Sequence, residues 1–242
     1  MLIFSLFFKE EYGMYKKLLV LVLSILISLV SSGTLRAGSS LVIDCFMPSD
    51  NGKFPKGWES KQMGEARGIY KVVLEEGNAI LCAHCTSKAV SIGKKIEIDL
   101  RKYPILKWRW KVVKSPTGAD ERHKKTGDSA AAIYVVFPNG MKVWSPKAIK
   151  YVWSSSSMPQ NSTTVSPYAS NTKIVVLENR ETPLGVWIEE EVNVLKDYTR
   201  FFGEKIVSAK MIGIMSDSDN TNSEVHACYD DIVLESISAE VQ

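Results

Sequence analysis

Apolar and polar side chains alternate most clearly over residues 106–112. The even-numbered positions of this segment hold Leu, Trp, Trp and Val, whereas the odd-numbered positions hold Lys, Arg and Lys. Because successive side chains of a β-strand point to opposite faces, this pattern predicts a strand with one apolar and one basic face. Residues Ala130–Phe137 are apolar on both alternating faces, which is typical of a central strand covered on both sides.

Short runs of the same β-forming kind recur along the chain, and turn residues such as Pro138-Asn139-Gly140 separate them. One helix is predicted over residues 194–202, with Gly203 as its C-terminal stop. Many short strands with a single helix predict an all-β fold, a single-domain β-sandwich of the jelly-roll, galactose-binding-like type over residues 38–242. The other predicted strands are Leu41–Phe46, Tyr70–Leu74, Ala79–His84, Lys94–Asp99, Ile105–Val113, Ala148–Trp153, Lys173–Leu177, Val186–Val192, Lys210–Met215 and Val225–Leu234.

Residues 1–37 have the features of a secretory signal peptide. Lys16 and Lys17 precede the apolar run Leu18–Val30, and small residues follow it, so cleavage is expected after Ser32 or after Ala37. The run is shorter than the ~20 apolar residues that cross a bilayer, which makes a retained anchor the lesser alternative. We therefore expect a periplasmic or secreted protein with no membrane span after cleavage.

The charge balance excludes general electrostatic binding to nucleic acid. The formal net charge is +3, but residues 1–37 hold four of the 30 basic and two of the 27 acidic residues, which leaves +1 on the remainder. Nucleic-acid binding needs clustered, uncompensated Lys and Arg side chains.

Four cysteines remain after cleavage: Cys45, Cys82, Cys85 and Cys228. In an oxidising compartment they allow two disulfides in three connectivities. A bridge from Cys45 to Cys228 is plausible if the first and last strands are neighbours. Cys82 and Cys85 have metal-site spacing, but no second such pair exists along the chain, which favours structural thiols.

An ordered set of motifs runs along the chain: Leu106–Val113, Gly127-Asp128, Ala131–Phe137, Tyr151–Trp153, Trp187, Glu190, Asp197-Tyr198, Phe202-Gly203, Gly213–Thr221 and Tyr229–Ile232. This set resembles domain-of-unknown-function family 3047, a group of exported bacterial proteins with no assigned activity. The resemblance implies an envelope or secreted location and supplies no reaction. The opening residues Ile43–Phe46 and Gly57-Trp58 and the closing Tyr229–Ile232 are also similar to the end strands of jelly-roll carbohydrate-binding modules, which often keep a structural calcium between those strands.

Aromatic and polar residues in the middle of the chain form the expected binding site. Arg109 would line a concave sheet and hold sugar hydroxyls or a carboxylate, beside Asp128 if their strands pair. The alternative is that the strand over residues 106–112 binds no ligand: its apolar face packs in the core and its basic face is exposed to solvent. The long polar stretch Ser154–Asn171 could be a binding loop, because it exceeds an ordinary connection. The expected ligand-binding residues are Arg109, Asp128, Tyr134, Tyr151, Trp153 and Glu190.

Two groups of acidic residues could hold a structural calcium ion. One is the run containing Asp217 and Asp219, which offers several oxygen ligands, although a self-satisfied turn explains it equally. The other joins Asp44 to Asp230 or Asp231 across the end strands. No other cofactor is required by the sequence.

The sequence favours an exported, non-catalytic protein that binds a carbohydrate or similar hydroxylated ligand, with a glycan or cell-envelope component as its partner. An envelope scaffold without a small ligand is the main alternative. Hydrolase or lyase activity on a polysaccharide would need paired carboxylates, and Glu189-Glu190-Glu191 lacks the alternation of known sandwich glucanases. Pairing of Glu190 with an arginine such as Arg109 is the simpler role for it.

Overall fold

The computed structural model describes residues 38–140, 144–203 and 208–237. The predicted signal peptide and both of its expected cleavage points lie outside these residues. The elements are β1 (Ser40–Asp44), η1 (Pro48–Asp50), α2 (Met63–Ile69), β2 (Tyr70–Glu75), β3 (Asn78–Thr86), β4 (Ala89–Asp99), β5 (Ile105–Lys114), η2 (Lys124–Thr126), β6 (Ala131–Phe137), β7 (Lys147–Trp153), β8 (Thr163–Val165), β9 (Thr172–Glu178), β10 (Ile188–Asn193), α3 (Val194–Phe202), β11 (Ser208–Asp217) and β12 (Glu224–Glu235).

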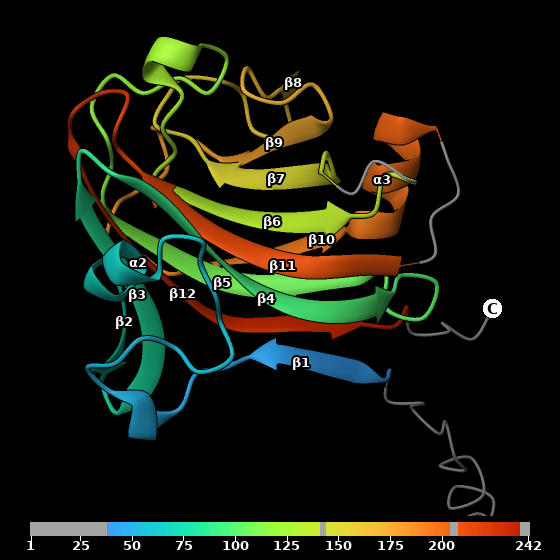
Figure 1. Cartoon of the computed structure of the whole chain (residues 1–242), viewed down its shortest axis with the longest axis horizontal. Helices are drawn as coiled ribbons and strands as arrows, with labels where there is room; N and C mark the ends of the chain where they lie inside the picture. Colours follow the sequence, from blue (N-terminus) through green and yellow to red (C-terminus); the bar gives the residue numbers. More distant parts are fainter. Residues whose placement is uncertain (1–37, 141–143, 204–207, 238–242) are drawn as a thin grey trace, which may run out of the picture. The chain divides into compact units, whose positions relative to one another are not determined.

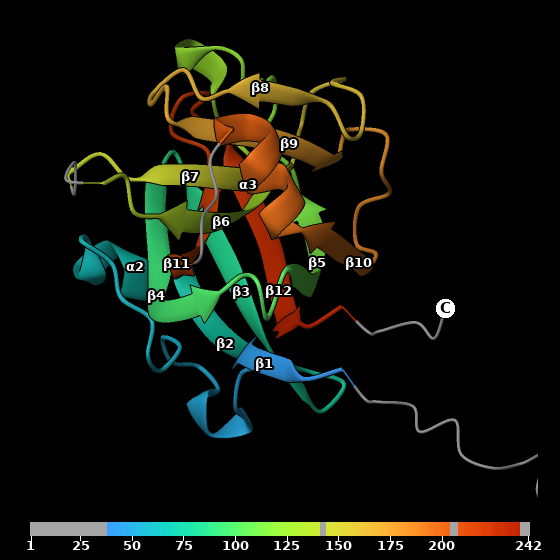
Figure 2. The same cartoon turned by 90° about the vertical axis from the view of Figure 1, so that its right-hand side faces the viewer.

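The strands form two six-stranded sheets, shown in Figures 1 and 2. The first sheet has the order β10-β5-β12-β3-β2, with β1 paired to β12, and the second has the order β4-β11-β6-β7-β9-β8. Neighbouring strands are antiparallel except β7 and β9, which run parallel. The predicted all-β sandwich is confirmed. None of the helices in the described ranges is long and apolar enough to cross a membrane.

The core lies between the sheets and is rich in large aromatic side chains. On the first sheet, the even-numbered residues of β5 face inward, and Trp108 contacts Trp110 with ring centres 5.2 Å apart. From the second sheet, Tyr151 lies 5.9 Å from Trp108, and Trp153 lies 6.1 Å from Trp110. All four rings are almost completely buried, so they stabilise the sandwich by excluding water from its centre.

This packing corrects the expectation that Tyr151 and Trp153 bind ligand. Both are odd-numbered residues of β7, and the alternation of the strand turns them toward the first sheet, while Lys150 and Val152 face the other way. The Tyr151 hydroxyl donates to Asp197 of α3 at 2.8 Å and is unavailable to an external ligand. Their role is in the core.

A second correction concerns Arg109 and Asp128, which were expected to be neighbours if their strands paired. The strands that carry or follow them, β5 and β6, belong to different sheets and do not pair. Arg109 lies on the outer face of the first sheet, where it forms ion pairs with Asp230 and Asp231 at 2.6 and 2.9 Å. Asp128 is buried beside the loop after β11 instead.

The cysteine pairing also differs from the expectation. β1 and β12 are neighbours as expected, but their register ends at Asp44, so Cys45 lies beyond the ladder and remains an exposed free thiol. Cys228 faces Cys82 of β3 directly, and these two form the disulfide. Cys85 is a buried free thiol.

The predicted helix at residues 194–202 is confirmed as α3, but it is not the single helix that was expected, because α2 forms over Met63–Ile69. The side chain of Asn193 caps its first turn by accepting from the backbone N–H of Lys196 at 2.9 Å. Gly203 ends it in the left-handed region, with φ of 66°, where glycine carries no Cβ penalty. The helix packs Tyr198 against Phe137, with ring centres 4.6 Å apart, and so closes the end of the core near β6.

Candidate functional site

A pocket opens on the outer face of the second sheet, the face turned away from the core. The strand alternation that buries Tyr151 leaves Tyr134 of β6 and Lys150 of β7 on this face, opposite each other in the β6–β7 register. Met215 of β11 lies beside them and accepts a long contact of 3.7 Å from the Tyr134 hydroxyl. These three side chains form the floor of the pocket.

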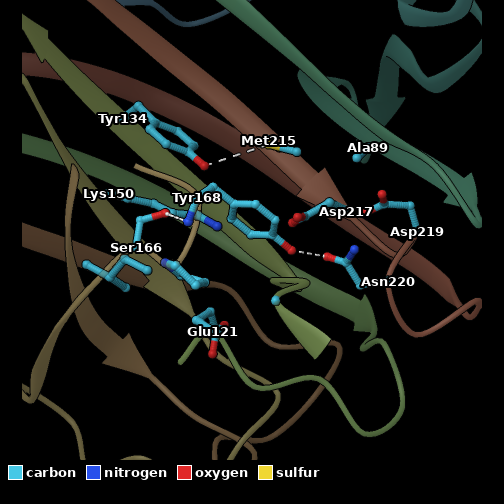
Figure 3. A pocket seen from close by; sticks show the side chains of 13 residues that line it. Ala89, Glu121, Tyr134, Lys150, Ser166, Tyr168, Met215, Asp217, Asp219 and Asn220 are labelled. Carbon is cyan, nitrogen blue, oxygen red and sulfur yellow. Dashed lines mark hydrogen bonds between the residues drawn. The ribbon is translucent and has the colours of Figure 1, made fainter. Parts of the chain in front are cut away.

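Three loops raise walls around this floor (Figure 3). They are the segment between β5 and β6, the long segment between β7 and β9, and the turn after β11. We call the cavity of about 220 Å³ between them the sheet pocket. Its lining residues are Ala89, Glu121, Gly127, Tyr134, Lys150, Ser166, Pro167, Tyr168, Ile174, Met215, Asp217, Asp219 and Asn220.

Lys150 places a buried positive charge in the sheet pocket. Its side chain is 5% exposed, its Nζ donates to Ser129 Oγ at 2.8 Å, and Nζ lies 5.5 Å from the centre of the Tyr134 ring. Burial opposes the charge, but the interactions with Tyr134, Asp217 and Glu121 outweigh it and raise the pKa of Lys150 above its usual value. The ammonium therefore stays charged, with three N–H groups that can donate hydrogen bonds.

Asp217 supplies the sheet pocket with a carboxylate whose pKa is strongly shifted. It is buried, and its Oδ1 accepts from the backbone N–H of Ser129 at 2.9 Å. Burial raises the pKa of Asp217 to about 6, although Lys150 and the Ser129 N–H act in the opposite direction. At neutral pH this carboxylate is ionised and can accept hydrogen bonds from a ligand.

Glu121 forms part of the wall and is 1% exposed. One of its carboxyl oxygens accepts from Ser154 Oγ at 2.6 Å, whereas Oε1 is buried without a hydrogen-bond partner among the described residues. Burial raises the pKa of Glu121 above its ordinary value. A buried oxygen without a hydrogen bond costs free energy, so a hydrogen-bond donor at Glu121 Oε1 would stabilise this wall.

Asp128 holds one wall in place. Its carboxylate accepts from the backbone N–H groups of Asn220 and Thr221 at 3.1 and 2.7 Å, and from the Thr221 hydroxyl at 2.6 Å. Carboxylate oxygens of Asp128, Asp217 and Asp219 lie within 4.8 Å of one another, so these three residues could hold a cation. The predicted structural calcium stays a prediction.

Tyr168 covers the mouth of the sheet pocket from the long segment between β7 and β9. Its hydroxyl contacts the carbonyl oxygen of Lys124 at 2.8 Å and Asn220 Oδ1 at 2.5 Å, while the side chain remains 55% exposed. Gly127 lies beneath it, and a Cβ at that position would stand 2.7 Å from the Tyr168 hydroxyl. The close approach requires glycine here.

A larger hollow of about 540 Å³ adjoins the sheet pocket and shares Tyr134 and Met215 with it. Its floor is the apolar part of the same outer face, including Val136 and Met211, and its rim is polar. The rim residues are Glu59, Ser60, Lys61, Gln62, Ser91 and Lys95. The two hollows therefore lie next to each other on the outer face of the second sheet.

The family model described as Protein of unknown function (DUF3047) matches residues 56–233. The chain belongs to this family. A comparison with curated proteins finds no match.

Among solved structures, the DUF3047 chain is similar to jelly-roll carbohydrate-binding modules. The family 11 module of the cellulase Lic26A-Cel5E of Clostridium thermocellum is 12% identical, with a TM-score of 0.44, and the match covers 85% of this chain and 99% of that one. A family 30 carbohydrate-binding module is 11% identical, with a TM-score of 0.45 and coverage of 87% and 93%. A Cel12A cellulase variant of Rhodothermus marinus is 12% identical, with a TM-score of 0.37 and coverage of 82% and 100%.

The expected ligand-binding residues of the DUF3047 chain lie in three places: the core, which holds Tyr151 and Trp153, the sheet pocket, and a hollow at the first sheet. Tyr134 lines the sheet pocket, and Asp128 supports its wall. Arg109 and Glu190 line a different hollow of about 370 Å³ at the first sheet. Glu190 does not pair with Arg109, because it accepts from Trp110 Nε1 at 3.0 Å, and its neighbour Glu189 stands opposite Arg109 in the register.

The expected metal residues are divided as well. Asp217 and Asp219 line the sheet pocket together. Asp44 accepts from Trp58 Nε1 at 2.8 Å and forms an ion pair with Lys94 at 2.9 Å. Asp231 is paired with Arg109 at 2.9 Å, and a calcium ion between the end strands stays a prediction.

Sequence reasoning missed Lys150, Glu121 and Tyr168 in this DUF3047 chain. A lysine inside the apolar strand Ala148–Trp153 was the available signal, because a strand covered on both faces rarely contains an unpaired charge. Glu121 lies in a charge-rich segment whose composition is typical of a solvent-exposed loop. Tyr168 lies in the long polar segment that was expected to be a binding loop, and this segment does contribute to the sheet pocket.

Proposed function

We propose that this protein binds a carbohydrate or a similar neutral, hydroxylated ligand in the sheet pocket. The observation that carries the proposal is the meeting of a buried ammonium, Lys150, and a buried carboxylate, Asp217, in one cavity that two tyrosine rings also line. Binding pockets of this kind combine apolar surface with a few convergent polar groups.

The mixture of charges favours a neutral ligand over an ion. An anion would meet the carboxylates of Asp217 and Asp219, and a cation would meet the ammonium of Lys150. A hydroxyl group both donates and accepts, so adjacent hydroxyls on one sugar ring can bond Lys150 and Asp217 together. The faces of Tyr134 and Tyr168 offer apolar surface for the C–H side of the same ring.

The size of the cavity limits what enters it. At about 220 Å³ the sheet pocket is smaller than the ~300–1,000 Å³ of ordinary ligand sites, which favours one ring as the occupant. The adjoining hollow of about 540 Å³ provides room for further rings along the sheet. We propose that the ligand is a terminal residue of a glycan, with the rest of the chain in the larger hollow.

An exported location fits this role and forms part of the proposal. The Cys82–Cys228 disulfide is of the kind that persists in oxidising compartments such as the periplasm or the exterior. A glycan or other cell-envelope component would be accessible there.

Calorimetric titration of the purified chain with neutral mono- and oligosaccharides tests the proposal. Lys150→Met and Tyr168→Ala are expected to weaken binding at least about tenfold, a loss of about 1.4 kcal/mol. Lys210→Met removes a lysine from the same sheet outside the pocket, and Trp144→Ala removes an aromatic ring that is 79% exposed; both should leave affinity unchanged.

Two outcomes would overturn the proposal. One is the absence of binding to every saccharide in a panel that includes envelope glycans. The other is binding that Trp144→Ala abolishes while Lys150→Met leaves it intact, because the ligand would then lie elsewhere. Release of shortened saccharides during the titration would instead show a hydrolase or lyase.

A further inference from the structure

Two cysteines and two histidines form a mirrored arrangement on the outer face of the first sheet. β3 carries Cys82-Ala83-His84, and the antiparallel strand β12 carries His226-Ala227-Cys228. The register places Cys82 opposite Cys228 and His84 opposite His226. Both alanines point into the core, so all four ligand-type side chains share the other face.

The distances within this cluster suit a metal ion. Cys228 Sγ lies 3.8 Å from His226 Nε2, and the ligand atoms of Cys82, His226 and Cys228 all lie within 4.8 Å of one another. A tetrahedral zinc ion with bonds of ~2.3 Å to sulfur and ~2.1 Å to nitrogen separates such atoms by about 3.6 Å. Side-chain adjustments of about an ångström would therefore complete the geometry.

The fourth side chain, His84, lies beside this cluster but outside the group of atoms within 4.8 Å, so its ring must move to reach a shared ion. The rings of His84 and His226 lie with their centres 5.3 Å apart. His84 Nε2 contacts Glu224 Oε1 at 2.7 Å, so Nδ1 is the nitrogen that remains for a metal. A carboxylate on the far nitrogen of a metal-binding histidine is the usual outer partner that fixes the ring.

The neighbouring lysines are each paired with a carboxylate. Lys111 is paired with Glu75, and Lys114 is paired with Glu224. A dication with two thiolates and two neutral imidazoles carries no net charge, so the site would add no uncompensated charge to this face.

We propose that reduction of the Cys82–Cys228 disulfide converts this cluster into a binding site for a thiophilic ion, Zn²⁺ or Cu⁺, held by both cysteines and both histidines. A thiol reductant supplies two electrons and two protons, which break the S–S bond and leave two thiols while the reductant becomes a disulfide. Binding of the ion then releases the two thiol protons. The disulfide and the metal are mutually exclusive, because both use the same sulfur atoms.

Cobalt substitution in the full folded chain tests this inference independently of saccharide binding. The background carries Cys45→Ser, which removes the exposed free thiol. After reduction and removal of excess thiol, one equivalent of Co²⁺ should produce a thiolate-to-cobalt charge-transfer band and the intense visible bands of tetrahedral cobalt. The oxidised chain should show neither, and Zn²⁺ or Cu⁺ should displace the cobalt.

His226→Ala and His226→Asn are expected to weaken Co²⁺ and Zn²⁺ binding at least about tenfold, whereas His123→Ala, the third histidine, should have no effect. Circular dichroism of each reduced variant without metal shows whether it remains folded. Equal cobalt spectra before and after reduction, a spectrum without the charge-transfer band, or undiminished binding by the folded His226 variants would each overturn the inference.

Discussion

Lys150 and Tyr134 are cross-strand partners on the outer face of the second sheet, and the ammonium of the one lies 5.5 Å from the ring centre of the other. The contact explains how a charged side chain is tolerated on a nearly buried strand position. The aromatic face attracts the cation, and carboxylates nearby balance its charge. The arrangement also fixes the ammonium at the floor of the sheet pocket rather than in bulk water.

Asp217→Asn is expected to stabilise the protein at neutral pH and to have no effect in acid. The folded pKa of Asp217, about 6, lies above its ordinary value of 3.8, so its stability contribution is present below about pH 4 and is lost as pH rises through 6. The shift corresponds to about 3 kcal/mol, but Lys150 loses a compensating charge in the variant, so we expect a gain of about 1–2 kcal/mol at pH 7. Urea unfolding of both chains at pH 4, 5.5 and 7 measures this, and equal differences at all three values would contradict it.

Glu190→Gln is expected to stabilise the protein at alkaline pH. Burial and the neighbouring Glu178 raise the pKa of Glu190 to about 8 from 4.5, so the parent chain is stabilised below about pH 4.5 and loses that contribution as pH rises through 8. Glutamine keeps the oxygen that accepts from Trp110 Nε1. The variant should therefore be more stable than the parent by on the order of a few kcal/mol at pH 9. Thermal melting across pH 5 to 9 checks this, with the exposed Glu189→Gln as the matched control.

Gly127→Ala should weaken saccharide binding while it leaves the fold intact. The backbone of Gly127 has a φ of −74°, which alanine adopts without strain. Its Cβ would lie 2.7 and 2.9 Å from the Tyr168 hydroxyl and Cε2, so the ring must move. The Cβ would also lie 3.0 Å from the backbone oxygen of His123, which must give by a few tenths of an ångström. Since Tyr168 is more than half exposed, we expect a stability change within about 1 kcal/mol and a several-fold loss of affinity. Unchanged affinity with a displaced ring would show that Tyr168 takes no part in binding.

Cys82→Ser with Cys228→Ser should lower the free energy of unfolding by about 2–5 kcal/mol. The disulfide closes a loop across a sequence separation of 146 residues, and the entropy model of cross-linking assigns such loops values near the upper end of that range. Cys45→Ser should leave stability unchanged, because that thiol is free and exposed. Denaturant midpoints of the three chains, with and without reductant, measure the effect. A parent chain insensitive to reductant would contradict it.

The local pattern of the sequence predicted much of the fold. The alternation in residues 105–113 identified β5 and its two faces correctly, because that pattern is a direct consequence of strand geometry. Gly203 marks the end of α3 through chemistry that acts within one turn. Both kinds of signal depend on neighbours in sequence, and both were confirmed.

The relations between distant segments could not be predicted in this way. Period-two alternation does not say which face of β7 is inward, so Tyr151 and Trp153 were assigned to the wrong side and Lys150 was overlooked. The disulfide depended on the register of β12 with β3, a pairing of residues far apart in the chain. Tyr134, Asp217 and Asp219 were named for their chemistry, but only the sheet order brings them into one cavity with Glu121.

The positions of β11 and β12 determine when the two sheets can be assembled. β11 is the strand through which β4 joins β6, and β12 joins β5 to β3 and also pairs with β1. Both are the last strands to leave the ribosome within the described chain. A nascent chain that stops before residue 208 therefore holds only the partial sheets β10-β5, β3-β2 and β6-β7-β9-β8. Their bare edges must be protected from pairing with other chains until translation has passed β12.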